Sequence, residues 1–409
     1  MFKFKKLIFS ILFFTSFCIE AMFDNRFLPT FMRPYSRRID EKTGLAVDLF
    51  ALTGYKAVGL DGDEVSIPEL SGAKYDLVKE ANAMVAMGYP NPLPSELQME
   101  NSIPYYTKGN LSGYGVMMGF NRDVTKNVSF GCFTYFMHIA SENKFELNTK
   151  NLNYLGPSEL LEIERTRLKI NRDLGLEGGV WSSTGFGDMT LYVRYGDLWQ
   201  YVWKMRTIDA GVKIGVIFPI GVQRNPQAPA SIPFSGDKHF GMFLEGNAEF
   251  ELKEDWFFGL FLNWSKRAAR TSNQRIPLKG EMPLYGVAYG DVQIKPGSTF
   301  ALSPYFRLEG LNKGFGIELR YLIGWHLKDS WIDKRFNPTV CADFKDIEKY
   351  AHWRSEYFTI TALYNFGKTE KLGGADALVH FTWDIPVHWL RAENFCKTHK
   401  LAVGFEFRY

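Results

Sequence analysis

Few residues in this sequence have the types and spacing that enzymatic or metal chemistry needs. His138 and Ser141 stand three residues apart, so on a strand they face opposite sides and cannot pair as base and nucleophile. The acidic run Asp61–Glu64 has only part of the spacing of a calcium-binding loop, and a solvated acidic turn explains it better. There is no Walker-type or G-x-S-x-G sequence. We expect no enzymatic activity, no cofactor and no metal.

The chemistry that the sequence does offer is a set of charged side chains at alternating positions, which on a strand share one face. A basic side chain that faces lipid at the middle of a bilayer costs about 2–4 kcal/mol, so in a membrane sheet these charges must face inward. The candidate lumen-lining residues are Asp48, Arg194, Lys213, Glu245, Glu249, Arg307, Glu309, Glu318, Arg320, Asp376, Glu406 and Arg408. Two interpretations stay open: a wet, solute-guiding lumen, or a structural ion-pair network that fills a narrow barrel.

The elements that carry these charges have a period of two. In MTLYVRY, Leu191 and Val193 share one face with Met189, while Thr190 and Arg194 share the other. About twelve such segments, each close to the length of ~9–11 residues that a tilted strand needs to cross a bilayer, begin near Leu45, Leu111, Val128, Met189, Ile208, Phe240, Trp256, Thr299, Phe315, Tyr357, Ala375 and Leu401. The sequence therefore predicts an all-β membrane protein, a closed antiparallel transmembrane β-barrel over residues 44–409.

The connections between these segments alternate between short and long. Turns such as KED and GLNKG are short, whereas residues 58–109 and 148–186 form long loops. Bacterial outer-membrane barrels keep this rule, with short turns in the periplasm, long loops outside and an even number of strands. We therefore expect both chain ends in the periplasm and the long loops on the external side.

Each of the two long loops contains a helical pattern. In residues 58–109, Leu77, Val78 and Met84 recur at helical spacing, with Ser71 as a candidate cap. In residues 148–186, the stretch 156–173 reads as a charged amphipathic helix with a proline near its start. One interpretation is that both helices pack over the barrel mouth; the other is that residues 61–97 dip into the lumen as a plug or gate.

The N-terminus reads as a secretory signal. Lys3, Lys5 and Lys6 precede the apolar run 7–19, and Ala21 offers a small residue for cleavage, which gives a signal peptide over residues 1–21. The apolar run is too short for a membrane anchor, which needs about 20 residues. Residues 22–43 would then form an N-terminal periplasmic segment.

The charge balance gives no sign of a nucleic-acid partner. The 48 basic and 45 acidic residues give a net charge of +3, and the signal peptide, with three lysines and Glu20, accounts for +2 of it. The remaining +1 argues against polyanion binding. Aromatic residues reach 16%, while charged residues at 23% keep the mean hydropathy at −0.18, so apolar side chains are abundant but interleaved.

Three cysteines follow the signal peptide: Cys132, Cys341 and Cys396. Cys341 and Cys396 fall in two external loops that are neighbours around the predicted barrel. In an oxidising compartment they would form a disulfide. The alternative is that Cys341 binds a metal together with the C-x-x-H motif of Cys396 and His399, a weak motif on its own.

The last strand, LAVGFEFRY, puts Phe405, Phe407 and Tyr409 on one face and Glu406 and Arg408 on the other. This ending resembles the C-terminal signal of bacterial outer-membrane barrels. The resemblance implies recognition by the barrel-assembly machinery and insertion into outer-membrane lipids. A chain that ends inside a sheet also fits a closed barrel, where the last strand pairs with the first.

A second resemblance covers residues 185–221. The pair GFGDMTLYVRY and IDAGVKIGVIFPIG is similar to a strand pair of the long-chain fatty-acid transporter class and of the related meta-pathway phenol-degradation outer-membrane proteins. This resemblance implies uptake of hydrophobic small molecules and an N-terminal plug. The Asn-Pro-Ala motif that fatty-acid transporters tend to show near the mature N-terminus is not found here, so the solute stays open.

Together these features predict a bacterial outer-membrane channel or transporter for passive or gated passage of small, hydrophobic solutes. The alternative is a surface-exposed structural or adhesive barrel whose external loops bind a partner. The sequence does not define the oligomeric state.

Overall fold

The computed structural model describes residues 25–32, 43–72, 74–98, 100–151, 155–312, 314–366 and 376–408. The predicted signal peptide, residues 1–21, and Tyr409 of the predicted assembly signal lie outside these ranges, as does most of the segment 22–43. No helix in these ranges is both long enough and apolar enough to cross a membrane.

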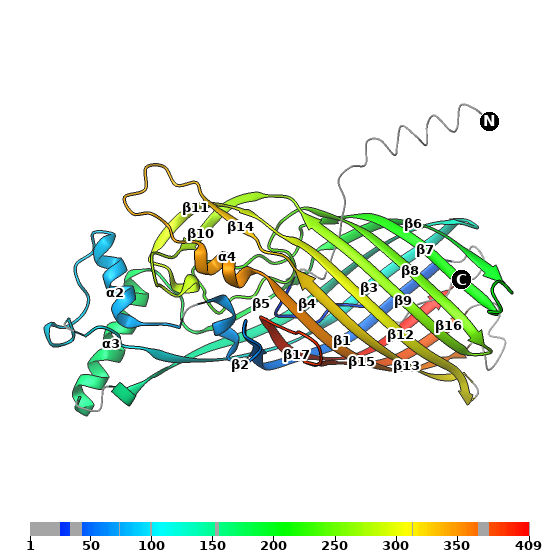
Figure 1. Cartoon of the computed structure of the whole chain (residues 1–409), viewed down its shortest axis with the longest axis horizontal. Coiled ribbons are helices and arrows are strands. Elements are labelled where there is room, and N and C mark those ends of the chain that lie inside the picture. The colour runs from blue at the N-terminus through cyan, green and yellow to red at the C-terminus, as the bar shows by residue number, and fades with distance from the viewer. Residues whose placement is uncertain are drawn as a thin grey trace.

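The structure is a closed antiparallel barrel of twelve strands (Figure 1). The wall strands, in chain order, are β1 (Thr43–Val58), β3 (Tyr105–Thr125), β4 (Val128–Leu147), β6 (Met189–Gln200), β7 (Thr207–Phe218), β8 (Gly241–Lys253), β9 (Trp256–Arg267), β12 (Ser298–Asn312), β13 (Phe315–His326), β15 (Trp353–Asn365), β16 (Asp376–Pro386) and β17 (Phe395–Arg408). Each pairs with its neighbours in this order, and β17 pairs with β1. Every predicted segment is one of these strands, so the predicted fold is confirmed.

The seam between the first and last strands runs from Gly44 opposite Arg408 to Val58 opposite Phe395. Gly404 lies in the turn-end part of this seam, directly between Asp48 on β1 and His380 on β16. A Cβ atom at residue 404 would lie 2.2 Å from the His380 ring and 2.4 Å from the Asp48 carboxylate. The glycine therefore gives the inward His380 side chain room to reach Asp48, whose Oδ2 lies 3.6 Å from His380 Nε2.

Side chains alternate between the two faces of the wall as the sequence predicts. On β17, Phe405 and Phe407 are 39% and 50% exposed on the outer face, while Glu406 between them is buried on the inner face. On β1, Leu45 and Leu49 point outward and Asp48 inward. An outer surface of this kind is the apolar band that a membrane barrel presents to lipid.

Short turns lie at one end of the barrel, the turn end, and long connections lie at the other, the loop end (Figure 1). β3 and β4 are 21 and 20 residues long, about twice what a bilayer requires, so they extend beyond the barrel wall toward the loop end. The last seven residues of the predicted loop 148–186 are also strand: β5 (Val180–Phe186) pairs with β4, which corrects that part of the loop assignment.

The loop end is a folded layer with its own small elements. It contains β2 (Glu64–Val65), η1 (Ile67–Ser71), α2 (Leu77–Ala86), η2 (Ser95–Leu97), η3 (Thr149–Asn151), α3 (Pro157–Asp173), η4 (Pro283–Tyr285), α4 (Lys345–Ala351) and a sheet of β10 (Arg270–Ile276), β11 (Ala288–Lys295) and β14 (Ser330–Asp333). Both predicted helices form, but the cap of α2 is Asp76 rather than Ser71, since the Asp76 carboxylate accepts a hydrogen bond from Val78 N.

The plug interpretation of residues 61–97 is wrong for its helix. Leu77, Ala81 and Met84 of α2 pack with Ile163 and Ile170 of α3 in a cluster of the loop-end layer. Figure 1 shows both helices at the far end of that layer, away from the wall strands. The part of this loop that contacts the apolar cluster of the lumen is η1, with Val65 just before it. The interpretation that the helices pack beyond the barrel mouth therefore holds.

The seam geometry predicts that Gly404→Ala destabilises the barrel by about 1–3 kcal/mol, because the added methyl group overlaps His380 and Asp48. Gly246→Ala is the matched control, since a Cβ atom there meets nothing within 4 Å. Heat-dependent migration on SDS gels would measure both midpoints. Equal midpoints for the two variants would contradict this account of the seam.

Candidate functional site: the lumen and its loop-end closure

Ion pairs fill the turn half of the lumen. Arg307 on β12 is at the centre: its Nη2 lies 2.8 Å from Glu249 Oε2 and its Nε lies 2.9 Å from Glu309 Oε1. Glu318 Oε2 lies 3.7 Å from Arg307 Nη1, and Glu318 Oε1 lies 2.8 Å from Arg320 Nη2. Five of the predicted lumen residues therefore form one buried network across β8, β12 and β13.

The five other predicted lumen residues whose side chains the structure describes also face inward. Lys213 Nζ lies 2.5 Å from Glu245 Oε1, and Arg194 Nη2 lies 2.7 Å from Asp209 Oδ1, a partner that the sequence analysis did not include. Asp48 contacts His380, and Glu406 is buried. Asp376 and Arg408 occupy the ends of β16 and β17, where the structure describes only their backbone.

There is little free space in the lumen beside this network. A cavity of about 10 Å³ lies among Thr30, Met32, Glu318, Arg320 and Asp384, which is at most one water molecule. Of the two interpretations of the inward charges, this geometry favours the ion-pair network that fills a narrow barrel.

Residues 25–32 lie inside the loop half of the lumen, which corrects their assignment to a periplasmic segment. Phe31 stacks on Tyr135 of β4 with ring centres 4.4 Å apart, and its ring centre lies 5.1 Å from that of Phe50 of β1. Phe27 and Leu28 belong to the same buried apolar cluster. This segment closes the lumen from within. It is the main element whose position differs from the one predicted from the sequence.

Hydrogen bonds tie the segment to the inner face of β17. Cys396 N donates to Arg26 O at 2.8 Å, and the Thr398 hydroxyl donates to Phe27 O at 2.6 Å. The buried Lys400 ammonium lies 3.4 Å from Thr30 O and 2.6 Å from Asp384 Oδ2. These bonds fix the backbone of the segment without a regular strand pairing.

The connection between β7 and β8 also folds into the lumen. Ala228, Ala230, Ile232 and Phe234 of this proline-rich stretch join the apolar cluster. The Ser141 hydroxyl donates to Ala230 O at 2.5 Å, and the Tyr135 hydroxyl bonds Phe234 O. The lumen at this level is therefore filled by two inserted segments and the wall side chains that they contact.

A buried acid anchors this inserted connection where β5 meets β6. Asp188 Oδ2 lies 2.7 Å from Arg267 Nη1, and Asp188 Oδ1 accepts from Gly221 N at 3.0 Å. Gly187 beside it has no room for a side chain, since a Cβ atom would lie 2.0 Å from the Tyr135 ring. The Gly-x-Gly-Asp motif thus lets the connection after β7 approach the wall closely.

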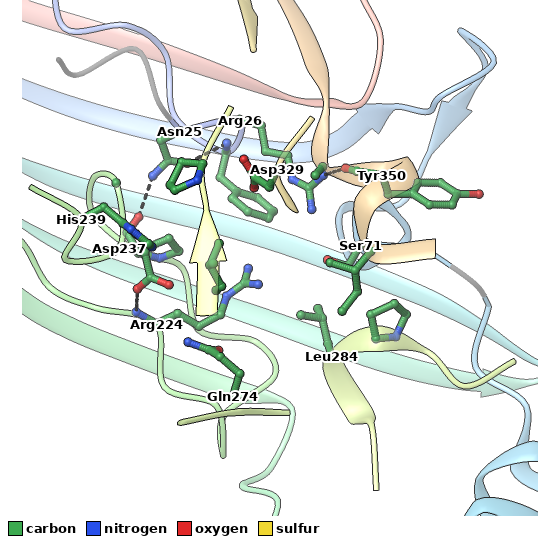
Figure 2. Close-up of a pocket in the computed structure, with 18 of the residues that line it drawn as sticks. Asn25, Arg26, Ser71, Arg224, Asp237, His239, Gln274, Leu284, Asp329 and Tyr350 are labelled. Carbon is green, nitrogen blue, oxygen red and sulfur yellow. Dashed lines mark hydrogen bonds between the residues drawn. The ribbon is translucent and has the colours of Figure 1, made fainter. Parts of the chain in front are cut away.

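Above the inserted segments lies a cavity of about 210 Å³, shown in Figure 2. Arg26 and Arg224 line it together with Phe27, Leu284 and Trp331. Burial, and next the neighbouring charge of Arg224, lowers the pKa of Arg26 to about 9, and burial lowers that of Arg224. The sequence analysis missed both arginines because neither belongs to a strand with a period of two.

The predicted Cys341–Cys396 disulfide does not form in the structure. Cys341 is exposed, whereas Cys396 is buried within β17, with its Sγ 3.6 Å from Lys56 O. β17 begins at Phe395, earlier than predicted, which places Cys396 in the wall and not in a loop. In the described ranges, no group of three or more His, Cys, Asp or Glu side chains could hold a metal ion.

Comparison with solved structures was made for the whole chain. The crystal structure of the COG4313 outer membrane channel from Pseudomonas putida F1 matches with a TM-score of 0.51 and 10% identity, over 92% of this chain and 100% of that one. The two chains share a fold. No protein-family model and no curated protein matches the sequence.

Two further channels match with lower scores. The Pseudomonas putida toluene transporter TodX has a TM-score of 0.32 and 10% identity, over 91% of this chain and 90% of that one. A Pseudomonas aeruginosa FadL homologue has a TM-score of 0.33 and 6% identity, over the same shares of the two chains. At these scores the likeness carries no argument about function.

Two carboxyl groups are buried side by side in the loop-end layer. Glu80 of α2 and Glu281 are 1% and 2% exposed, and Glu281 Oε1 accepts from Val287 N at 3.1 Å. Burial, and then the charge of Glu281, raises the pKa of Glu80 well above its ordinary value. Burial raises the pKa of Glu281 from 4.5 to about 7.

This pair predicts that the loop-end layer loosens at alkaline pH. A raised folded-state pKa means that the folded layer binds the proton more tightly than the unfolded chain, so this stabilisation is complete below about pH 4.5 and is lost as pH rises through about 7. Hydrogen exchange of α2 amides, corrected for intrinsic rates, should be faster at pH 8 than at pH 6. Glu80→Gln should weaken this dependence and the exposed Glu96→Gln should not. An unchanged dependence in Glu80→Gln contradicts the assignment.

The ion network predicts that Arg307→Met destabilises the barrel by about 3–5 kcal/mol, because it leaves the buried Glu249 carboxylate without its cation. Arg206→Gln, which removes an exposed pair with Glu254 at the turn end, should cost less than about 1 kcal/mol. Urea unfolding in detergent measures both. Similar small losses would mean that the carboxylates are solvated in a wet lumen.

Proposed function

We propose that this protein is a bacterial outer-membrane channel for gated passage of small hydrophobic solutes, with its loop end facing outward. In this proposal the chain is secreted with a cleaved signal peptide. The barrel-assembly machinery then inserts it into outer-membrane lipid through its last strand. The shared fold with a bacterial outer-membrane channel supports this assignment.

The observation that carries the proposal is the apolar segment inside the lumen. Phe27, Leu28 and Phe31 pack against inward-facing apolar wall residues, although the lumen of a simple aqueous pore is polar. An apolar path through the loop half suits a hydrophobic solute, which replaces the contacts of the segment as it passes. Because this path is filled at rest, passage requires residues 25–32 to move.

The proposal predicts that Phe31→Ala speeds solute passage severalfold, because it removes the ring that stacks on Tyr135 and contacts Phe50. Phe336→Ala is the matched control, since Phe336 is 93% exposed at the loop end. The measurement is uptake of a small neutral aromatic compound by cells with an intact outer membrane. Uptake equal to that of cells without the protein, in wild type and Phe31→Ala alike, would contradict the channel function.

A second candidate is a surface-exposed barrel whose loops bind a partner. The observation that favours it is the loop-end layer itself, which has apolar clusters of its own around α2, α3, β10 and β11. A passive covering of the barrel mouth does not need a separately packed core. This function predicts a lumen that stays sealed in Phe31→Ala and binding that is lost when α3 is deleted.

A further inference from the structure

Two arginines in the loop-end cavity lie against the same aromatic ring, Phe27. The guanidinium carbons of Arg26 and Arg224 lie 5.4 and 5.8 Å from the centre of the Phe27 ring. Arg26 Nη1 donates to Tyr350 O at 2.5 Å, a bond that Figure 2 marks. Across the residues that the structure describes, neither guanidinium lies within ion-pair distance of a carboxylate.

Two carboxylates also line the cavity, and each partly offsets the charge of one arginine: Asp329 acts on Arg26, and Asp237 acts on Arg224. Asp329 Oδ1 lies 2.9 Å from His326 Nε2 and accepts from Gly297 N at 2.8 Å. Asp237 Oδ1 accepts from the backbone N of Arg224 and not from its side chain. Two like charges surrounded by protein repel each other more strongly than they would in water. Arg267 is paired with Asp188, so the other three lining arginines, including Arg275, outnumber the two lining carboxylates. The lining therefore has an excess of positive charge that a bound anion would neutralise.

The unpartnered polar atoms of the cavity point to the same kind of ligand. Arg224 Nε, Trp331 Nε1 and Ser71 Oγ are buried and have no hydrogen-bond partner among the described residues, and all three residues line the cavity. Each of these atoms carries a hydrogen, and the two nitrogens can only donate. A buried donor without an acceptor is costly, so the missing component is an acceptor.

The walls between these donors are apolar. Phe27, Pro283, Leu284 and Ile294 line the cavity, and its volume of about 210 Å³ limits the occupant to a compact molecule. A fully hydrated inorganic anion gains nothing from such walls, and a neutral hydrocarbon leaves the donors unsatisfied. An anionic head on a small apolar body satisfies both parts of the cavity.

We propose that this cavity binds a compact carboxylate with an apolar body, whose carboxylate is held by Arg26 and Arg224. A guanidinium matches a carboxylate with two parallel hydrogen bonds. This inference rests on the proposed channel function and deepens it by naming a class of solute. Because Arg26 belongs to the segment that fills the lumen, the bound carboxylate lies directly against the element that must move.

The test is calorimetric titration of the full chain in detergent with benzoate, and with benzamide as its neutral counterpart. We expect benzoate to bind and benzamide to bind about tenfold more weakly or not at all, since charged hydrogen bonds are lost. Arg224→Gln and Arg26→Gln should each weaken benzoate binding about tenfold or more. Arg165→Gln, on the exposed face of α3, should leave it unchanged. Arg224→Gln without ligand should melt at the same temperature or higher, which separates lost binding from lost folding.

Three outcomes would overturn the inference: equal binding of benzoate and benzamide, inorganic phosphate binding at least as tightly as benzoate, or benzoate binding that survives both arginine substitutions. Absence of benzoate binding in a preparation that still passes a neutral aromatic solute sinks this inference and leaves the proposed function standing. Absence of both binding and passage sinks both.

Discussion

The rest of the structure depends on the closure of the sheet between β1 and β17. Hydrocarbon offers no partner to a free backbone N–H or C=O group, so a sheet that crosses a membrane must leave no edge. Here the seam forms over the whole length of the last strand, from Gly44 opposite Arg408 to Val58 opposite Phe395. Closure with only twelve strands makes the interior narrow, and inward side chains then meet across it.

The narrow interior explains why the two halves of the lumen are filled by different kinds of side chain. In the turn half, charged side chains that cannot face lipid are buried together in ion pairs such as Arg307 with Glu249. In the loop half, an apolar cluster that includes Phe50 and Met137 buries the rings of Phe27 and Phe31, beside a few hydrogen-bonded polar groups such as Thr398. A solute that passes must displace apolar contacts first and then travel beside fixed ion pairs. The lumen is thus a filled passage whose loop half is held by apolar contacts together with hydrogen bonds from β17.

The wall was predictable because a strand in a membrane has a strict period of two, which each segment shows on its own. The helices α2 and α3 were predictable because their apolar residues recur at helical spacing within a short stretch of the chain. The inserted segment was not, because its partners Thr398 and Lys400 lie some 370 positions away in the chain and impose no local pattern. The early start of β17 at Phe395 was missed because the first residues of the strand are mostly polar. They pair with β1 but do not show the alternation of apolar and polar side chains.

The measurement that tests the account most directly is the conductance of the detergent-purified protein in a planar lipid bilayer. The account predicts insertion with little steady current and only brief openings, because residues 25–32 and the ion pairs fill the lumen. Large, stable, ohmic steps would contradict it, since they require a continuous water path where the structure has packed side chains.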